Sequence, residues 1–277
     1  MGTLGGMNNT TEAIRISNSF DGLRVLSLES RRAIEIATLI RNQGGDPFVA
    51  PSMREIPLSQ NREAVQFAGE FDMLILLTGV GTRLLDRVLD GKLSERIKGM
   101  TVVARGPKPA AVLRELQIPV DILVPEPNTW RETLRAVEGR PERRIAVQEY
   151  GRPSPELLDG LRAQGAEVTA IPVYQYDLPE DTAPLREAVH RLADGVIDVL
   201  LFTTAVQAFH LFRVAAEEGV DILPAFQRAV VASIGPTTTE ALAECGIHPD
   251  LEPTHPKMGF LVAETARAAH EILGRKR

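Results

Sequence analysis

The stretch that decides the fold is LRVLSLESRRAIEIATLIRNQGGDPFVAPSM, at residues 23–53. It recurs at residues 143–174 as RRIAVQEYGRPSPELLDGLRAQGAEVTAIPVY. Each copy contains an apolar run, a polar turn, a helical pattern, a glycine and a second apolar run that ends near a proline. The spacing of about 120 residues is that of a whole domain, since solenoid repeats are much shorter. The sequence therefore indicates two similar domains, and a cleft between two domains is a common place for a small ligand.

Two further segments repeat in the same order. FDMLILLTGVGTRLLDRVL (71–89) matches IDVLLFTTAVQAFHLFRVA (197–215), and TVVARGPKPAAVLRELQI (101–118) matches AVVASIGPTTTEALAECGI (229–247). Apolar runs that are almost continuous are typical of strands covered on both faces, as in a parallel sheet. We predict such strands at Val25–Leu28, Pro47–Ala50, Met73–Leu77, Thr101–Ala104, Ile122–Val124, Ile145–Gln148, Val168–Pro172, Val199–Thr203, Ala229–Ile234 and Pro249–Glu252.

Helical spacing of apolar residues separates these strands, as at Ala33–Asn42, Pro155–Gln164 and Thr239–Glu244. Several of these segments end in a glycine, which accepts the left-handed conformation that closes a last helical turn. Strand–helix–strand alternation predicts an α/β architecture. Residues 52–60 and 173–181 follow equivalent strands and read as extended. A chain that crosses between domains at both places gives an inserted second domain, and a plain tandem pair is equally compatible with the sequence.

Composition limits the class of protein. The 277 residues are 44% hydrophobic and 25% charged, with a net charge of −6. These values are ordinary for a soluble globular protein, and an acidic chain is a poor general binder of nucleic acid or anionic membranes. Residues 1–13 have neither a basic start nor an apolar core, so we interpret them as a flexible leader and expect a cytoplasmic protein. Cys245 is the single cysteine, which excludes an intrachain disulfide.

Ligands of open α/β sheets bind beyond the carboxyl ends of the strands. The segments after the predicted strands are rich in small, hydroxyl and basic residues: Glu29–Arg32, Thr78–Arg83, Arg105–Lys108, Glu149–Arg152, Thr203–Ala205 and Gly235–Thr239. Backbone N–H groups at helix starts bind anions. Several such segments around one cleft would suit a polyanionic small molecule.

Each feature also has a structural interpretation. Gly-Pro-Thr-Thr-Thr at 235–239 predicts a hydroxyl-capped helix start with Glu240 in the first turn, with or without ligand contact. Arg31 and Arg32 are either solvated charges or ligand contacts. Tyr174 and Tyr176 either line the cleft or pack the crossing segment. Glu29 and Glu149 occupy equivalent strand ends and favour a structural role. The basic tail at 275–277 is explained either by a favourable charge at a helix C-terminus or by binding of nucleic acid or a partner.

Other functional classes lack their motifs. Thr78-Gly79-Val80-Gly81 lacks the third glycine of a dinucleotide loop, because position 84 is leucine, and there is no phosphate-binding Gly-x-x-x-x-Gly-Lys-Ser/Thr loop. There is no Gly-x-Ser-x-Gly elbow. Cys245 and His210 both read as packed, structural residues. The five histidines show no metal-binding spacing: His190, His210, His248, His255 and His270.

The arrangement resembles the uroporphyrinogen-III synthase family. The resemblance is carried by LILLTGVGT (74–82), LLFTTAVQA (200–208), ASIGPTTTEALAECGI (232–247) and the run from Glu149 to Tyr176, and it extends from Leu23 to Glu264. It implies two flavodoxin-like, doubly wound parallel-sheet domains joined by a two-stranded linker. The first domain would be residues 1–51 plus 175–277, and the second would be residues 52–174.

The resemblance also implies a reaction. Hydroxymethylbilane, a linear tetrapyrrole with many carboxylates, loses water, inverts ring D through a spiro intermediate and closes as uroporphyrinogen III. No cofactor or metal is implied. We expect a monomer that binds neither nucleic acid nor membranes, and transient contact with hydroxymethylbilane synthase, which makes the unstable substrate. A non-catalytic sensor that binds a tetrapyrrole or another anion is the alternative, and a two-domain solute-binding protein is a third reading.

Residue roles carry over from the family position by position. Tyr174 would donate a proton to the departing hydroxyl. Pro109 stands where the family often has a threonine, which shifts the expected carboxylate contacts to Arg105 and Lys108. The full set of expected substrate-binding residues is Arg31, Thr78, Gly79, Arg105, Gly106, Lys108, Arg152, Thr203, Thr204, Thr237 and Thr238. The main task of such a protein is to hold the chain ends in the shape for ring closure, because the pyrrole expels water with little acid help.

Overall fold

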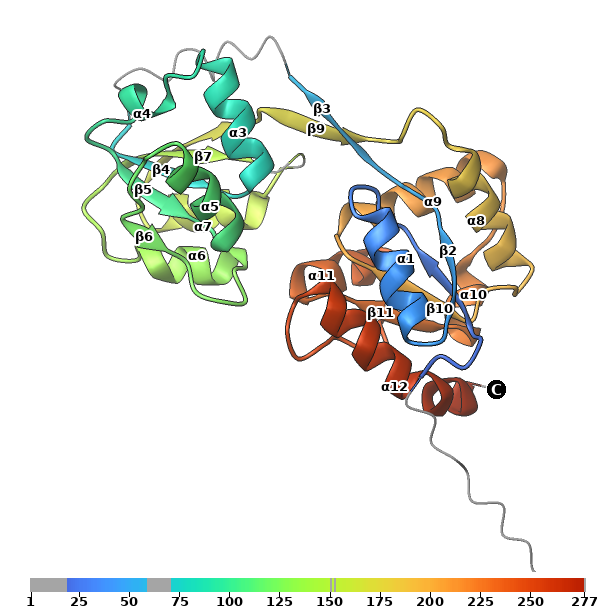
Figure 1. The fold of residues 1–277 in the computed structure, drawn as a ribbon. Coiled ribbons are helices and arrows are strands. Elements are labelled where there is room, and N and C mark those ends of the chain that lie inside the picture. The colour runs from blue at the N-terminus through green and yellow to red at the C-terminus, as the bar shows by residue number, and fades with distance from the viewer. Residues whose placement is uncertain (1–18, 59–70, 150, 152, 277) are drawn as a thin grey trace, which may run out of the picture.

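The computed structural model describes residues 19–58, 71–149, 151 and 153–276. The predicted leader lies outside these residues. Two separate parallel sheets each carry their own helices, and a two-stranded antiparallel ribbon connects them (Figure 1). We call the parts built on the four-stranded and five-stranded sheets the first and second lobes. The predicted α/β fold class with two parallel sheets and a two-stranded linker is therefore confirmed.

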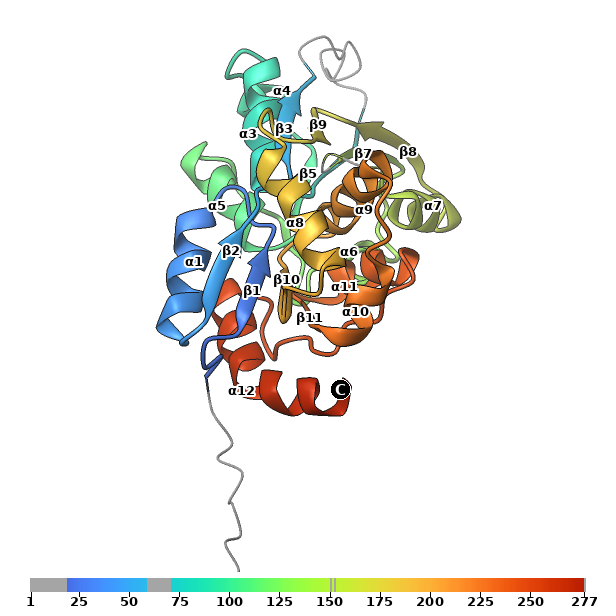
Figure 2. The ribbon, with the colours of Figure 1, turned by 90° about the vertical axis from the view of Figure 1, so that its right-hand side faces the viewer.

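The first lobe is assembled from both ends of the chain. Its sheet has the order β11-β10-β1-β2, with strands β1 (Arg24–Ser27), β2 (Asp46–Val49), β10 (Val199–Phe202) and β11 (Val230–Ser233). Its helices are α1 (Ala33–Asn42), α8 (Ala183–Ala193), α9 (Val206–Glu218), α10 (Leu223–Arg228), α11 (Pro236–Glu244) and α12 (Met258–Lys276). Helices α1 and α12 cover one face, and α8, α9 and α10 cover the other (Figure 2). The chain thus crosses between the lobes, which decides against a plain tandem pair of sheets.

The second lobe is built from the middle of the chain. Its sheet order is β6-β5-β4-β7-β8, with strands β4 (Met73–Leu76), β5 (Thr101–Ala104), β6 (Ile122–Leu123), β7 (Arg144–Gln148) and β8 (Glu167–Ile171). Its helices are α3 (Gly79–Val88), α4 (Leu93–Arg96), α5 (Pro107–Glu115), α6 (Trp130–Val137) and α7 (Pro155–Ala163). Along β4, Leu74 and Leu76 enter one buried cluster while Met73 and Ile75 enter the other. Because both faces are covered, the whole strand is apolar.

The two crossing segments pair with each other. Strand β3 (Arg54–Pro57) runs antiparallel to β9 (Tyr174–Asp177), with Arg54 opposite Asp177 and Pro57 opposite Tyr174. These strands lie within the segments that the sequence reads as extended. They leave the first lobe after β2 and return to it before α8. Where each domain ends along this ribbon stays a prediction.

The duplication is preserved in polar contacts at the amino ends of the strands. Arg24 and Asp198 join the starts of β1 and β10 through a guanidinium–carboxylate pair at 2.8 Å. Arg144 and Asp72 make the same pair, also at 2.8 Å, between the starts of β7 and β4. Hydrogen bonds from the side-chain guanidinium of Arg144 and from backbone N–H groups lower the pKa of Asp72 to about 2. Equivalent strands are therefore fastened in the same way in both lobes.

Two predicted elements differ in detail. Residues 249–252 form no strand, and Leu251 makes only an isolated parallel bridge to Ala232. Pro249 and Pro253 have no N–H to donate, which prevents a regular ladder there. Helix α11 begins at Pro236 rather than Thr239, its N-cap is Gly235, and no side chain caps it. The expected hydroxyl cap was therefore wrong, and Glu240 lies beyond the first turn.

The basic C-terminal helix end has a tertiary role. The Lys276 Nζ donates to the carbonyls of Phe226 and Ala229 at 3.0 and 2.7 Å and to the Asp250 carboxylate at 2.6 Å. It therefore caps the C-terminus of α10, a different helix from its own. Lys276→Met should lower the free energy of unfolding by about 1.5–3 kcal/mol, because charged hydrogen bonds are lost and carbonyls are left unpaired. Urea unfolding measures this. The neighbouring Arg275→Met, at an exposed residue, should cost far less, and equal losses would contradict the capping role.

Candidate functional site

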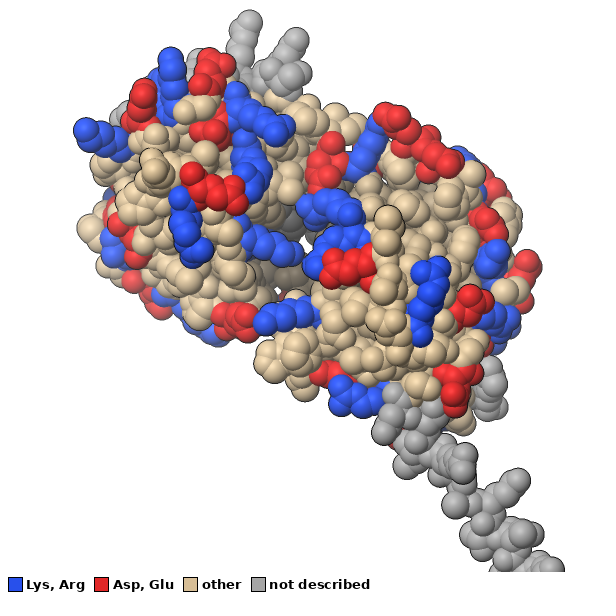
Figure 3. All heavy atoms as spheres, in the orientation of Figure 1, with Lys and Arg blue, Asp and Glu red and all other residues tan. Residues whose placement is uncertain are grey.

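The carboxyl ends of the two sheets face each other across a groove. Figure 3 shows a hollow between the lobes with Lys and Arg side chains on both sides of it. Lys108 in the second lobe lies close enough to Arg31, Arg32 and Glu29 of the first lobe to be affected by their charges. The groove is therefore lined by the loops that follow the strands, as expected for ligand sites of open α/β sheets.

Cations from both lobes gather at this groove. Arg31 and Arg32 precede α1, where the Glu29 carboxylate accepts hydrogen bonds from both of their backbone N–H groups at 3.1 Å. The Arg31 guanidinium also pairs with Glu55 of the linker at 3.1 Å. Lys108 lies in the first turn of α5 on the facing lobe. The Arg31 side chain is half exposed and paired with Glu55, so it is not purely solvated, and its role as a ligand contact stays a prediction.

The pKa of Lys108 is affected by the cations gathered around it. The pKa of Lys108 lies below the ordinary lysine value, first because the surrounding protein excludes water and then because Arg31, Arg32 and Arg105 repel its charge. Glu29 opposes this shift. Lys108 nonetheless remains exposed at the protein surface. A cation that is crowded by like charges and still exposed is well suited to an incoming anion.

Strand-end hydroxyls lie where the strand order reverses in each sheet. In the first lobe, the Thr203 hydroxyl donates to Glu29 at 2.6 Å and accepts from the Gln207 side-chain amide at 2.9 Å. The Gln207 carbonyl oxygen accepts from the backbone N–H groups of Thr203 and Thr204. Thr203 is thus held by its own lobe, and both threonines are half-buried. The buried Gln207 that fixes them was not predicted from the sequence.

In the second lobe, Thr78 joins a helix start to the linker. Its hydroxyl accepts from the Gly81 backbone N–H at 2.9 Å, so it is the N-cap of α3. The same oxygen lies 3.2 Å from the Tyr174 hydroxyl. Gly79 follows directly, and a Cβ there would come within 3.0 Å of the Lys108 carbonyl. The structure therefore brings Thr78, Gly79, Lys108 and Tyr174 close together.

The two tyrosines of the linker form a pair in which Tyr174 is buried and Tyr176 is half-buried. The rings of Tyr174 and Tyr176 meet edge to face at 5.3 Å, and their hydroxyls are 3.3 Å apart. Burial raises the pKa of both phenols, against the hydrogen bond that Tyr174 shares with Thr78. Both phenols, which are protonated at neutral pH even with ordinary pKa values, keep their protons to a still higher pH and can donate hydrogen bonds. Tyr174 is only 1% exposed, so it packs the linker whatever else it does.

The remaining predicted substrate-binding residues lie at the starts of α11 and α5, except for one outside the described residues. Thr237 and Thr238 lie in the first turn of α11, with Thr238 buried and Thr237 half-buried. Gly106 is the N-cap of α5 with φ +105°, and a Cβ there would approach the Asn128 side chain at 2.9 Å, so this position requires glycine. Arg105 follows β5 beside it. Arg152 lies outside the described residues.

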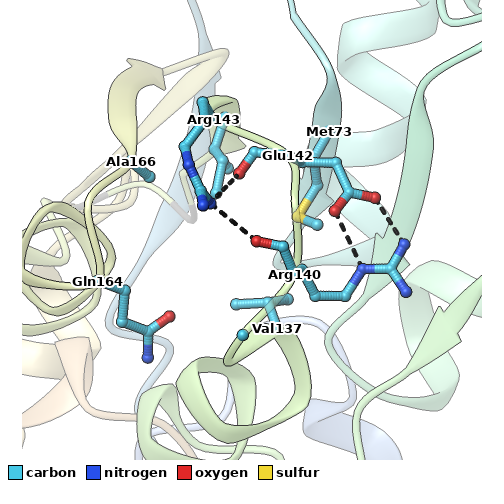
Figure 4. A pocket seen from close by; sticks show the side chains of 9 residues that line it. Met73, Val137, Arg140, Glu142, Arg143, Gln164 and Ala166 are labelled. Carbon is cyan, nitrogen blue, oxygen red and sulfur yellow. Dashed lines mark hydrogen bonds and ion pairs between the residues drawn. The ribbon is translucent and has the colours of Figure 1, made fainter.

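Away from the groove, the described residues form a small cavity but no cluster suited to a metal ion. A small cavity of about 90 Å³ lies at the opposite edge of the second sheet, among Met73, Val137, Arg140, Glu142, Arg143 and Gln164 (Figure 4). There Arg143 donates to the carbonyls of Arg140 and Glu142, so its guanidinium is committed to the local turn. Within residues 19–58, 71–149, 151 and 153–276, no three His, Cys, Asp or Glu side chains are grouped to hold a metal ion.

Two structural readings of single residues are supported. His210 is buried, and its Nδ1 lies 2.7 Å from the Ser52 carbonyl oxygen, as expected of a packed residue. Cys245 packs against the core of the first lobe. Across the described part of the chain, none of the helices is both long enough and apolar enough to span a bilayer.

Comparisons with known proteins agree with this geometry. The family "Uroporphyrinogen-III synthase HemD" (HEM4) matches residues 34–263. A protein of Methanothermobacter thermautotrophicus named "Putative uroporphyrinogen-III synthase" is 32% identical over 225 residues, covering 78% of this chain and 87% of that protein. "Uncharacterized protein YjjA" of Bacillus subtilis is 31% identical over 264 residues, covering 90% and 97%.

A solved structure extends the similarity to the fold. A mutant uroporphyrinogen III synthase of Thermus thermophilus superimposes with a TM-score of 0.70 at 26% identity, covering 90% of this chain and all of that one. The shared arrangement of two α/β lobes and a strand linker, together with the match along most of the sequence, places this chain in the uroporphyrinogen-III synthase family.

Proposed function

We propose that this protein is a uroporphyrinogen-III synthase, which cyclises hydroxymethylbilane with loss of water and inversion of ring D. Family membership supports the reaction class. The observation that carries the proposal for this chain is the groove in which Lys108 of one lobe faces Arg31 and Arg32 of the other. A flexible chain with many carboxylates is the kind of ligand that such opposed cations can grip from two sides.

The chemistry asks mainly for positioning. Loss of the hydroxyl group from the terminal pyrrole leaves an azafulvene cation, which the substituted carbon of ring D attacks to give a spiro intermediate. Bond cleavage and reclosure then give the inverted ring. Holding two ends of one molecule in the reactive geometry can lower a barrier by several kcal/mol. In this proposal the cations and helix starts fix the carboxylates, and no cofactor takes part.

Tyr174 is the proposed proton donor to the departing hydroxyl. A phenol is protonated at neutral pH, and burial raises the pKa of Tyr174 further, which makes it a weak acid that can assist by hydrogen bonding. Its hydroxyl lies beside Thr78 at the start of α3. Since Tyr174 is almost fully buried, its hydroxyl would have to reach the substrate beside Thr78, or the linker would have to move before the proton is donated. This position fits a group that assists a reaction rather than one on which the reaction depends.

Tyr174→Phe is expected to lower kcat about three- to thirtyfold and to leave measurable activity, because the pyrrole itself drives loss of water. The measurement is the initial rate of isomer III formation, with Tyr176→Phe as the matched control on the same strand. Wild-type kinetics for Tyr174→Phe would remove this residue from the mechanism.

Lys108 predicts a pH dependence. Its pKa lies below the lysine value of 10.5, so it loses its proton at a lower pH in the folded protein than in the unfolded chain. The kcat/KM should therefore fall as the pH rises through that lowered pKa. Over the same window the folded state binds fewer protons than the unfolded state, so this group makes stability rise with pH. Destabilisation caused by the titration of Lys108 therefore cannot explain the fall in kcat/KM at high pH.

Lys108→Arg tests this pH dependence, because a guanidinium keeps its proton throughout the range. The alkaline limb of the kcat/KM profile should move upward in the variant. An unchanged limb would assign the titration to another group.

The decisive assay separates the function from its alternative. Freshly made hydroxymethylbilane is given to the protein, and the oxidised products are separated into isomers I and III. A synthase enriches isomer III, whereas a sensor or solute-binding protein leaves only the spontaneous isomer I. The monomeric state, the cytoplasmic location and contact with hydroxymethylbilane synthase stay predictions, which gel filtration, fractionation and pull-down can test.

A further inference from the structure

An ion pair crosses the groove at the end away from the linker. The Arg131 Nη1 in α6 of the second lobe lies 2.6 Å from the Glu240 Oε1 in α11 of the first lobe. Figures 1 and 2 both show α6 and α11 approaching each other at that end, while β3 and β9 join the lobes at the other. The groove is therefore bounded by covalent linkers at one end and by this pair at the other.

Arg131 is positioned by contacts within its own lobe, and Glu240 is positioned by its place on α11. The Thr129 hydroxyl accepts from the Arg131 backbone N–H at 3.2 Å and fixes the start of α6. The guanidinium carbon of Arg131 lies 4.3 Å from the centre of the Trp130 ring, a favourable cation–π distance. Glu240 lies three residues after Thr237 and so shares its face of α11. The pair is thus next to an expected carboxylate contact.

The charge of Glu240 is unexpected in a groove for a polycarboxylate. A carboxylate beside Thr237 repels such a ligand unless its charge is neutralised, and Arg131 neutralises it. Both side chains remain 41–46% exposed, so the pair is accessible to solvent and to other anions. An exposed pair of this kind holds its partners weakly and can exchange them.

We propose that Arg131 and Glu240 form a displaceable latch: they hold the lobes together in the free protein, and a carboxylate of the ligand takes Arg131 from Glu240 on binding. Arg131 is then a further substrate-binding residue. The second half of this proposal rests on the proposed function, whereas the latch itself does not.

The latch is tested without substrate. Spin labels at the exposed Asn42 in α1 and Glu156 in α7, in a Cys245→Ala background, report the distance between the lobes. Arg131→Gln and Glu240→Gln should each lower the ratio of closed to open protein about two- to fivefold, as expected for an exposed pair. The exchange R131E/E240R should restore it. Salt at about 0.5 M, where the screening length is about 4 Å, should shift the ratio in the same direction as the single variants and by less.

Glu115→Gln is the matched control. It breaks the Arg83–Glu115 pair, which has the same 2.6 Å separation and similar exposure but lies within the second lobe. Single variants that keep the wild-type distances would overturn the latch, and so would an equal effect of Glu115→Gln.

Kinetics with hydroxymethylbilane tests the exchange of partners. Arg131→Gln should raise KM about three- to tenfold, through loss of a charge-assisted contact, with a smaller change in kcat. Glu240→Gln frees Arg131 and should leave KM at or below the wild-type value. If Glu240→Gln raises KM as much as Arg131→Gln does, the exchange is refuted. If the wild type makes only isomer I, the proposed function fails, and the distance measurements still decide the latch.

Discussion

Lys108→Glu is expected to lower kcat/KM for hydroxymethylbilane about a hundredfold, mainly through KM. The change removes a charge-assisted contact and adds repulsion of a polycarboxylate, which together amount to about 2.8 kcal/mol of binding. Lys108 is sensitive because it stays exposed to a ligand while the charges of Arg31 and Arg32 on the other lobe act on it. Initial rates over a range of substrate concentrations separate KM from kcat.

Arg114→Glu supplies the control for this reversal. Arg114 lies on the same helix, in its last turn, and is exposed. It undergoes the same change in net charge, so any general effect of charge on a polyanionic substrate appears in both variants. A loss in Lys108→Glu no larger than that in Arg114→Glu would contradict a specific role for Lys108 in the groove.

Gly81→Ala is expected to destabilise the protein by about 1–3 kcal/mol, against the usual benefit of alanine in a helix. A Cβ at Gly81 would stand 2.0 Å from the Gln148 Nε2. Gln148 is fully buried, and its carbonyl oxygen accepts from the Thr78 N–H at 3.4 Å, so its amide has little room to withdraw. Forced movement there also displaces Thr78, and with it the contact to Tyr174. Urea unfolding measures the first effect and kcat the second.

The matched control is Gly259→Ala. Gly259 also lies in the first turn of its helix, and a Cβ there would meet nothing within 4 Å. It should be neutral or stabilising by up to about 1 kcal/mol. Combining Gly81→Ala with Gln148→Ala should recover part of the loss, since the obstructing amide is gone. Equal stabilities for Gly81→Ala and Gly259→Ala would disprove the clash.

Much of the fold could be predicted because it depends on local patterns. The apolar run of β4 and its echo in β10 mark strands buried on both faces, and α1 matches its predicted bounds of Ala33–Asn42. The failures are also local in cause. At 236–239 the threonines suggested caps, but proline at Pro236 already fits the first helical turn, so the helix starts earlier.

The candidate site was predicted as a set of loops, and less well as a set of contacts. Strand ends identify which residues can face a ligand, so the places of Thr78, Lys108 and Thr203 after strands made them candidates. Gln148 and Gln207, which hold those loops, gave no signal beyond their positions near strand ends. Their roles arise from partners that packing brings close, such as the Thr78 backbone N–H for the Gln148 carbonyl oxygen.

The sequence by itself determined that two similar α/β units exist and which loops end their strands, because periodicity and turn residues act over a few residues. Only the tertiary structure decided that the first sheet takes strands from both chain ends. It alone decided that Lys108 faces Arg31, and that Arg131 meets Glu240 from 109 residues away. Such contacts depend on how two separately folded lobes are oriented by the linker, and short-range patterns carry no record of that orientation.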